Sequence, residues 1–282
     1  MENSQLKLNA KSVLKTTYWM SFLAIIIFDI INGVCNSIGN SVKNIGATTD
    51  TGDYMKYMER GDYQRALEEL SESTSAQNPL FSLLGSIIAV CIAIFFINIL
   101  SVGLKKMFLR ARITRKADIG DLFGMFSSYG SVMKTMFFYD LYVWLWSLLF
   151  IIPGIIKSYS YYMVPYILAE NPNISTDRAF EISKKTMDGE KGKAFYMHLS
   201  FIGWYLLGVL ACCIGVLFVD PYANATYAEF YAYVKQKALA TGIATPADFG
   251  EAASDIIILK NKSCSVNLNS FFIARILKID YL

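Results

Sequence analysis

The chain has 282 residues, of which 54% are hydrophobic and 17% are charged, and its mean hydropathy is +0.38. Soluble domains carry about 25% charged residues, so this composition argues against an ordinary soluble protein and favours a membrane domain. The net charge of +3 is small, and the basic residues cluster beside apolar segments, which argues against nucleic acid as a partner.

The first apolar run covers residues 18–34 and follows three lysines. A signal peptide begins in the same way. No small-x-small cleavage site follows this run, however, and Val34 replaces the small residue that lipoprotein processing needs before Cys35. We therefore expect an uncleaved first membrane helix, with a signal peptide as the alternative.

A polar segment, residues 35–79, leads to a second apolar run at residues 80–104, which is long enough for a membrane span of about 20 residues. Within the polar segment, a helix is expected from Asp53 to Leu70. Basic residues beside a span mark its cytoplasmic end. Those after the second run are Lys105, Lys106, Arg110, Arg112, Arg115 and Lys116. The first helix is therefore expected to leave the cytoplasm and the second to return, with the polar segment outside.

Residues 118–134 are expected to form a cytoplasmic connector, which an aromatic helical hairpin follows. Its arms are predicted at residues 136–152 and 155–169, with the turn at Pro153 and Gly154. Each arm would be about 22–26 Å long, which is shorter than the ~30 Å hydrocarbon core. The hairpin therefore either spans a locally thinned bilayer or inserts as a re-entrant pair.

A capped amphipathic helix is predicted from Ser175 to about Met187, with Gly189 as its stop. The last apolar run, residues 194–219, is too long for one comfortable span. It predicts two helices, separated by a break that ends at Gly215.

The two C-terminal hairpins resemble each other. The first contains WSLLF and the second WYLLG, and each motif is followed by a glycine and then by a Pro-Tyr pair. The residues concerned are Gly154, Pro165 and Tyr166 in the first hairpin, and Gly215, Pro221 and Tyr222 in the second. Paired repeats are common in membrane folds with a central site, and they also arise by simple duplication.

Several motifs occur in order across these hairpins: IPG, PYI, ENP, SFIGW and DPY begin at residues 152, 165, 170, 200 and 220. With them, residues 5–237 resemble a bacterial multi-pass membrane family known as domain of unknown function 975. The resemblance implies an integral membrane protein with no assigned activity. More distantly, the hairpins are similar to the membrane-embedded part of some glycerophosphodiester phosphodiesterases. The chain lacks a hydrolase domain, so that activity is not carried over.

Ionisable residues inside apolar runs are the candidate functional residues, because a charge at the centre of a span costs about 2.5–3.5 kcal/mol. They are Asp29, Asp140, Lys157, His198 and Asp220. One interpretation is a polar cavity in which Asp29 or Asp220 binds a cation or relays protons. The alternative is that each side chain is neutral or hydrogen-bonded to a neighbouring helix. Likewise, the tyrosines near Tyr166 either line a ligand groove or form an aromatic belt at the interface.

Enzyme signatures are absent from the sequence. His198 is its only histidine, which excludes a histidine-based metal site and a Ser-His-Asp triad. The five cysteines show no CxxC pair and no metal-ligand spacing. We therefore expect no catalytic activity, no metal and no cofactor.

These observations predict an all-α, polytopic membrane protein with about six membrane helices, two of its hairpins being broken by Pro and Gly. Residues 1–237 would form the membrane domain and residues 238–282 a linker and C-terminal tail, with both termini in the cytoplasm of a bacterial cell. The leading hypothesis is a non-enzymatic envelope component that binds membrane lipids, a partner membrane protein or a second copy of itself. The alternative is a permease for ions or small solutes.

Overall fold

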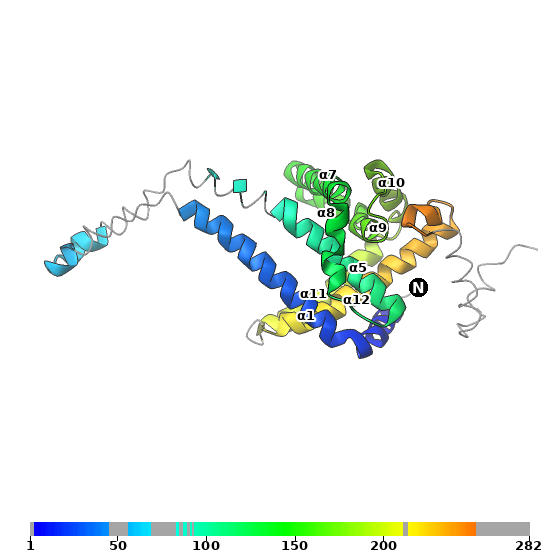
Figure 1. Ribbon diagram of the computed structural model, residues 1–282, viewed down its shortest axis with the longest axis horizontal. Helices are drawn as coiled ribbons and strands as arrows, with labels where there is room; N and C mark the ends of the chain where they lie inside the picture. Colours follow the sequence, from blue (N-terminus) through cyan, green and yellow to red (C-terminus); the bar gives the residue numbers. More distant parts are fainter. Residues whose placement is uncertain are drawn as a thin grey trace, which may run out of the picture.

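A computed structural model describes residues 3–44, 56–68, 83–84, 87–88, 91, 93–210 and 214–251. Within these ranges the chain forms helices and turns and contains no β-strand. The prediction of an all-α fold is therefore confirmed. In Figure 1 most of the labelled helices gather in one bundle, from which α1 extends as a long rod.

Helix α1 (Asn3–Asn44) is one continuous helix of 42 residues, about 63 Å long at 1.5 Å per residue. Its N-terminal part packs against the bundle, where Leu6 and Ala10 are fully buried. Farther along, apolar side chains such as Trp19 and Ile30 are exposed. The apolar run at residues 18–34 is thus the middle of a longer helix.

Residues 56–68, in the polar segment, are helical except around Gly61, whose φ of +73° belongs to a left-handed turn. Glycine adopts this conformation without the steric cost of a side chain. The turn interrupts the single helix expected from Asp53 to Leu70. Both of those end residues lie outside the described ranges.

The C-terminal part of the second apolar run forms the π-helix η1 (Ala93–Ile97) and the start of α5 (Asn98–Thr114). Helix α5 does not stop where the apolar run ends at Leu104 but continues through most of the basic cluster. Arg115 caps the C-terminus of α5. It adopts the left-handed conformation with φ +57° and donates its N–H to Ala111 O.

A first hairpin follows two short elements, α6 (Gly120–Phe123) and η2 (Gly124–Ser128). Its arms are α7 (Tyr129–Leu149) and α8 (Ile151–Ser160). Phe150 alone joins them, in an extended conformation with φ −157° and ψ 143°. The reversal therefore falls at Phe150, and its prediction at Pro153 and Gly154 was wrong.

The reason is that Pro153 and Gly154 serve the helix rather than the turn. Pro153 is the third residue of α8, where its missing N–H leaves no helical hydrogen bond unmade. Gly154 lies against α7, because a Cβ there would be only 2.7 Å from the Cα of Ser147. The glycine thus lets the two helix backbones approach closely.

The arm expected at residues 155–169 is two helices. Helix α8 ends at Ser160, and α9 (Val164–Glu170) begins after a turn, with Pro165 as its second residue. Proline is favourable in this first helical turn. The motif prolines at residues 153 and 165 therefore both mark helix starts.

The prediction of the capped amphipathic helix is confirmed in α10 (Thr176–Thr186). The Ser175 hydroxyl accepts a hydrogen bond from the Arg178 N–H at 3.4 Å. Gly189, the expected stop, has a φ of +79°.

The second hairpin consists of α11 (Lys191–Leu210) and α12 (Ile214–Ala240). Pro221 lies inside α12, which continues through it, so this proline does not break the hairpin. A Cβ on Gly215 would lie 2.7 Å from the Cα of Gly208. The two backbones therefore meet at glycines, as α8 meets α7 at Gly154.

The packed structure extends beyond α12. After a turn at Gly242, η3 (Pro246–Phe249) returns to the bundle and buries Phe249. Residues 238–251 are thus structured, although the sequence suggested a linker. Residues 252–282 lie outside the described ranges, and the division into a membrane domain and a tail stays a prediction.

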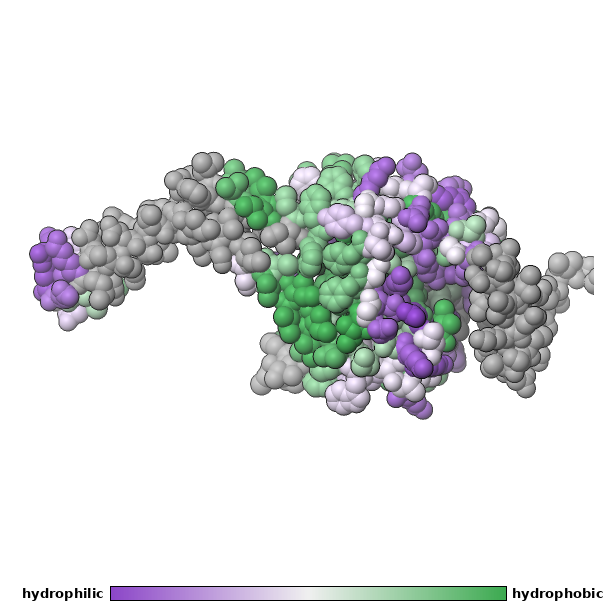
Figure 2. All heavy atoms as spheres, viewed as in Figure 1, coloured by the Kyte–Doolittle hydropathy of each residue, from purple (hydrophilic) through white to green (hydrophobic). Residues whose placement is uncertain are grey.

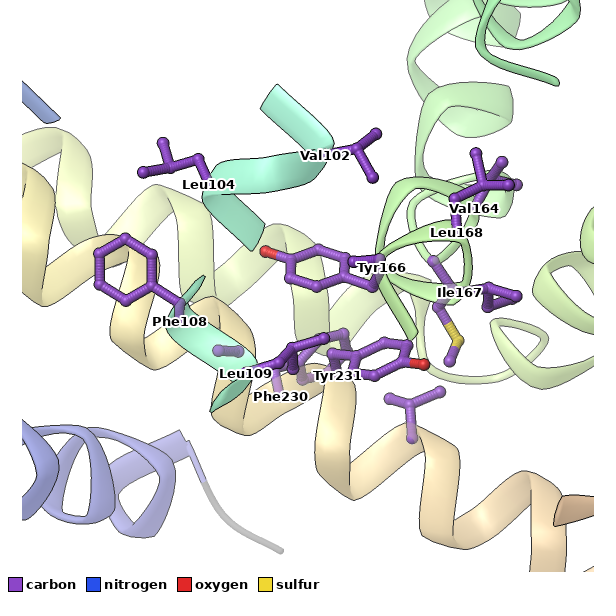
Figure 3. Packing of buried hydrophobic residues seen from close by; sticks show 14 of the residues in the cluster. Val102, Leu104, Phe108, Leu109, Val164, Tyr166, Ile167, Leu168, Phe230 and Tyr231 are labelled. Carbon is purple, nitrogen blue, oxygen red and sulfur yellow. The ribbon is translucent and has the colours of Figure 1, made fainter. Parts of the chain in front are cut away.

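Helix α12 lies at the centre of the core and packs against α1, α5, α10 and α11. Figure 3 shows Tyr231 of α12 beside Tyr166 of α9, with Leu109 and Phe108 of α5 close by. The two tyrosine rings stack with their centroids 5.0 Å apart and their planes at 18°. This contact joins α9 to α12, and burying such apolar area stabilises the fold by about 25 cal/mol per Å².

One helix among the described residues, over Asn3–Ser37, is long and apolar enough to cross a membrane by length and composition. Helices α8 and α9 are about 15 Å and 10 Å long, which is less than the ~30 Å hydrocarbon core. Neither α8 nor α9 alone is long enough to cross a bilayer, and the set of six membrane helices stays a prediction.

The packing of α5 on α6 generates a stability prediction. Gly103→Ala should lower the free energy of unfolding by about 2 kcal/mol, because the added methyl group would overlap the backbone carbonyl of Leu122. Gly130→Ala is the matched control, since a Cβ there meets open space and alanine is the better helix former. Thermal melting in detergent measures both changes. A Gly103→Ala protein that melts at or above the wild-type temperature would contradict this packing.

Candidate functional site

The last turns of α12 form a paired-charge end of the molecule. Glu229, whose side chain is 6% exposed, forms an ion pair with Arg112 of α5, whose Nε lies 3.0 Å from the Glu229 carboxylate. Lys235 contacts Glu170 of α9 at 2.7 Å and Glu251 at 2.8 Å. A buried carboxylate is tolerated only when it is paired and hydrogen-bonded, so these contacts determine where α5 and α9 meet α12.

Glu190, in the turn before α11, is shared by two lysines. Lys193 contacts it at 2.8 Å and Lys237 of α12 at 2.9 Å. Burial opposes the charged carboxylate, but the hydrogen bonds and charges of the two lysines outweigh it, so the pKa of Glu190 lies below its usual value. The group therefore stays ionised at neutral pH and fastens α11 to α12.

Arg178 holds the segment after α12 against α10. Its Nε and Nη2 donate to the two carboxylate oxygens of Asp248 at 3.1 and 3.0 Å, a bidentate pair. The Arg178 guanidinium lowers the pKa of Asp248 to about 2, and hydrogen bonds from Thr245 act in the same direction. Asn171 adds bonds to the carbonyls of Ala247 and Asp248.

Asp140, one of the candidate residues, is hydrogen-bonded to a neighbouring helix. The Asn98 amide donates to the Asp140 carboxylate, which joins the start of α5 to α7. This contact agrees with the alternative interpretation, in which such a side chain has a structural role.

His198 of α11 lies in a cluster of tyrosines. Its ring centroid is 4.5 Å from that of Tyr227, 5.3 Å from that of Tyr162 and 5.5 Å from that of Tyr159. Its Nδ1 lies 2.9 Å from the carbonyl oxygen of Ala194, one turn earlier in the same helix. These contacts make His198 part of the packing between the two hairpins.

Asp29 and Asp220 lie within electrostatic range of each other. Asp29 is exposed on α1, whereas Asp220 of α12 is half-buried and accepts the Tyr205 hydroxyl at 2.8 Å. The motif residue Tyr166 is 2% exposed and belongs to the core. Tyr222 packs its ring against Phe201, 5.3 Å away.

A groove of about 760 Å³ opens between α7, α8 and α10, and we call it the α7–α10 groove. Lys157, predicted from the sequence as a site residue, lines it. Aromatic rings in mutual contact form its floor. They are Phe138, Tyr142, Tyr161 and Phe180, with centroid separations of 5.0–6.2 Å. Of the five candidate site residues, only Lys157 lines this groove. The other four, Asp29, Asp140, His198 and Asp220, lie elsewhere.

Lysines stand around the aromatic floor. They are Lys134, Lys157, Lys184 and Lys185. Lys157 Nζ lies 4.6 Å from the ring centroid of Trp146, and Lys184 Nζ lies 5.5 Å from that of Tyr161. A surface with aromatic rings below and ammonium groups above fits a ligand that carries both apolar and anionic parts.

Sequence reasoning found Lys157 but missed the α7 side of the groove. Lys134, Phe138, Tyr142 and Trp146 occur at intervals of four residues, which places them on one face of a helix. The four-residue spacing could have predicted this face of the groove. It was missed because residues up to 134 were expected to form a connector, whereas α7 begins at Tyr129.

A family model described as protein of unknown function (DUF975) matches residues 54–238. The chain belongs to this family. The DUF975 match includes both hairpins and begins at residue 54, whereas the resemblance was expected from residue 5. Comparisons with curated proteins and with solved structures give no match. The membrane nature of the DUF975 protein and its likeness to glycerophosphodiester phosphodiesterases therefore stay predictions.

The Arg178–Asp248 pair predicts a pH-dependent stability. Asp248→Asn should destabilise the protein at pH 7 by on the order of 1–2 kcal/mol, allowing for solvent screening. Because folding lowers this pKa from 3.8 to about 2, the stabilisation is complete above about pH 4 and is lost as the pH falls towards 2. The melting difference between wild type and variant should shrink over that window. Asp188→Asn, at a side chain that is 83% exposed, should show no such difference, and a pH-independent gap would contradict the assignment.

The Arg112–Glu229 pair predicts a rescue. Arg112→Met leaves the Glu229 carboxylate buried without its ion-pair partner and should cost about 3 kcal/mol. Adding Glu229→Gln removes the buried charge and should recover most of that loss. Melting of the two proteins in detergent measures both effects. A double variant less stable than the single one would show that the pair does not carry this energy.

Proposed function

We propose that this DUF975 protein is an integral, multi-pass protein of the bacterial cell membrane, which binds lipid or a partner membrane protein without catalysing a reaction. The observation that carries the proposal is the separation of apolar and charged surface. On the face of the bundle shown in Figure 2, hydrophobic residues gather on the side from which α1 extends, and hydrophilic residues gather on the opposite side.

The apolar surface is concentrated at the free ends of both hairpins. Ile151, next to the turn of the first hairpin, is 76% exposed, and Leu210, at the end of α11, is 83% exposed. Trp19 on α1 is 73% exposed. Contiguous apolar surface of this kind marks contact with lipid or protein. The paired-charge end lies away from it, as expected for a region in contact with water.

The dimensions favour a full span by α1, which is about 63 Å long, and re-entrant insertion of the first hairpin. Helix α8 provides about 15 Å, half of the ~30 Å core. The N-terminal part of α7 is packed in the bundle, where Val132 and Met136 are buried. Only the outer part of that hairpin is then available to lipid, so its tip would lie near the middle of the bilayer.

The orientation follows from the basic residues. The cluster on α5 and the lysines at the start of α1 favour the cytoplasm for the paired-charge end. Both chain termini would then lie on that side, and the polar segment between α1 and α5 outside.

A permease is the second candidate. It is favoured by the proximity of Asp29 and Asp220, which belong to α1 and α12 and interact electrostatically. The breaks that this alternative placed at Pro153 and Pro221 lie inside helices, so Asp29 and Asp220 carry it alone. Asp220→Asn should abolish ion flux into proteoliposomes if this candidate holds. Flux equal to that of wild type would remove these residues from the mechanism.

The membrane proposal predicts the depth of the hairpin tip. A spin label on Ile151→Cys, in a cysteine-free protein in vesicles, should collide strongly with oxygen and weakly with a water-soluble nickel chelate. A label on Thr241→Cys, an exposed position beyond α12, should show the reverse. Strong chelate collision at Ile151 would contradict insertion of the hairpin, and so would release of the protein by alkaline carbonate.

A further inference from the structure

The α7–α10 groove extends from the paired-charge end towards the exposed apolar tip of the first hairpin. On its α7 side, the residues that line the groove begin with Lys134 and end with Trp146, which is four residues before the turn at Phe150. Thr135 and Thr176 join the two walls through a hydrogen bond of 2.9 Å between their hydroxyls. Basic residues thus occur at both ends of the groove, with Lys134 at one end and Lys157 over Trp146 at the other, and the apolar surface of the tip begins beyond Trp146.

The charges of the groove do not cancel. Glu181 is engaged by Lys185 at 2.7 Å and by Arg178 at 2.9 Å. Lys134, Lys157 and Lys184 make no ion pair with any carboxylate of the described chain, and Asp177 makes none with a cation there. Three free ammonium groups against one free carboxylate leave a net positive site.

A second hollow of about 530 Å³ shares lysines with the α7–α10 groove. Lys157, Lys184 and Lys185 line both hollows. The ammonium groups of Lys157 and Lys184, each of which faces an aromatic ring, therefore border both hollows. A long lysine side chain can contact apolar surface while its charge remains in water.

We propose that the α7–α10 groove binds the phosphate headgroup of an anionic membrane lipid, whose acyl chains follow the apolar end of the hairpin. This inference rests on the proposed membrane insertion. The unpaired lysines supply the charge that a phosphate diester needs. The aromatic floor and the adjoining apolar tip distinguish a lipid from a soluble phosphate, which has no apolar part to bury.

The test is native mass spectrometry of the full-length protein in detergent, titrated with phosphatidylglycerol or with phosphatidylcholine. Wild type should bind phosphatidylglycerol with at least tenfold preference. Lys157→Gln/Lys184→Gln should weaken this binding about tenfold or more, because each basic residue contributes ~1 kcal/mol towards an anionic lipid and 1.4 kcal/mol is tenfold. Lys157→Arg/Lys184→Arg, which keeps both charges, should retain most of the affinity.

The matched control is Lys15→Gln/Lys116→Gln, which removes the same charge at exposed positions outside the groove. It should bind phosphatidylglycerol as wild type does. Equal losses in both double variants would show a diffuse charge effect and overturn the site. Asp177→Asn removes the free carboxylate and should strengthen binding severalfold. If Lys157→Gln/Lys184→Gln does not fold, Lys134→Gln, at an exposed residue, is expected to weaken binding about threefold.

Two further outcomes decide the source of the phosphate and the dependence on insertion. Displacement of the lipid by millimolar inorganic phosphate would overturn the lipid assignment in favour of a soluble anion. A protein that resists carbonate extraction but binds both lipids equally would overturn this inference alone. A protein that carbonate releases would instead contradict the proposed membrane function.

Discussion

The paired charges at the end of α12 are the constraint on which the rest of the structure depends. Glu229, Lys235 and Lys237 lie in the last turns of α12 and reach α5, α9 and the turn before α11. Because an unpaired buried charge is costly, the buried carboxylates of Glu229 and Glu190 require their partners beside them. These pairs hold the segments that the hydrophobic core, including the Tyr166–Tyr231 stack, also joins.

This arrangement also explains how one chain carries an exposed apolar surface without losing a unique fold. Apolar contacts alone are not directional, and the free ends of the hairpins offer little that fixes their orientation. The specificity resides at the opposite end, in contacts such as the bidentate Arg178–Asp248 pair. The hairpins are held at their bases, and their apolar tips are exposed.

Local signals in the sequence predicted the structure where one residue type has one physical role. Ser175 caps α10 as expected, since a hydroxyl group has a defined function at a helix start, and the left-handed Gly189 lies in the turn that follows the C-cap residue Met187. The hairpin turn was wrongly predicted at Pro153 and Gly154 because each of these residue types has two structural roles. Proline fits a helix start as well as a turn, and glycine fits a close helix crossing as well as a reversal.

Contacts between distant segments could not be read in the same way. Arg178 and Asp248 are 70 residues apart in the sequence. Nothing in the residues around either one indicates that they pair. For the α7–α10 groove, the spacing on α7 was readable, but its meeting with Lys184 of α10 depends on how the helices pack. Asp29 and Asp220 were singled out by their apolar surroundings alone, and this criterion identifies unusual residues without saying what they face.

The one-residue connection at Phe150 imposes a constraint on length that composition does not reveal. Since successive helical residues are rotated by about 100°, inserting or deleting one residue between Trp146 and Lys157 would turn α8 relative to α7 and carry Lys157 away from the indole it covers. The apolar residues of the tip, by contrast, touch little of the protein and can exchange with one another freely. Homologous hairpins should therefore vary widely in the identity of their tip residues while keeping the number of residues between these two positions unchanged.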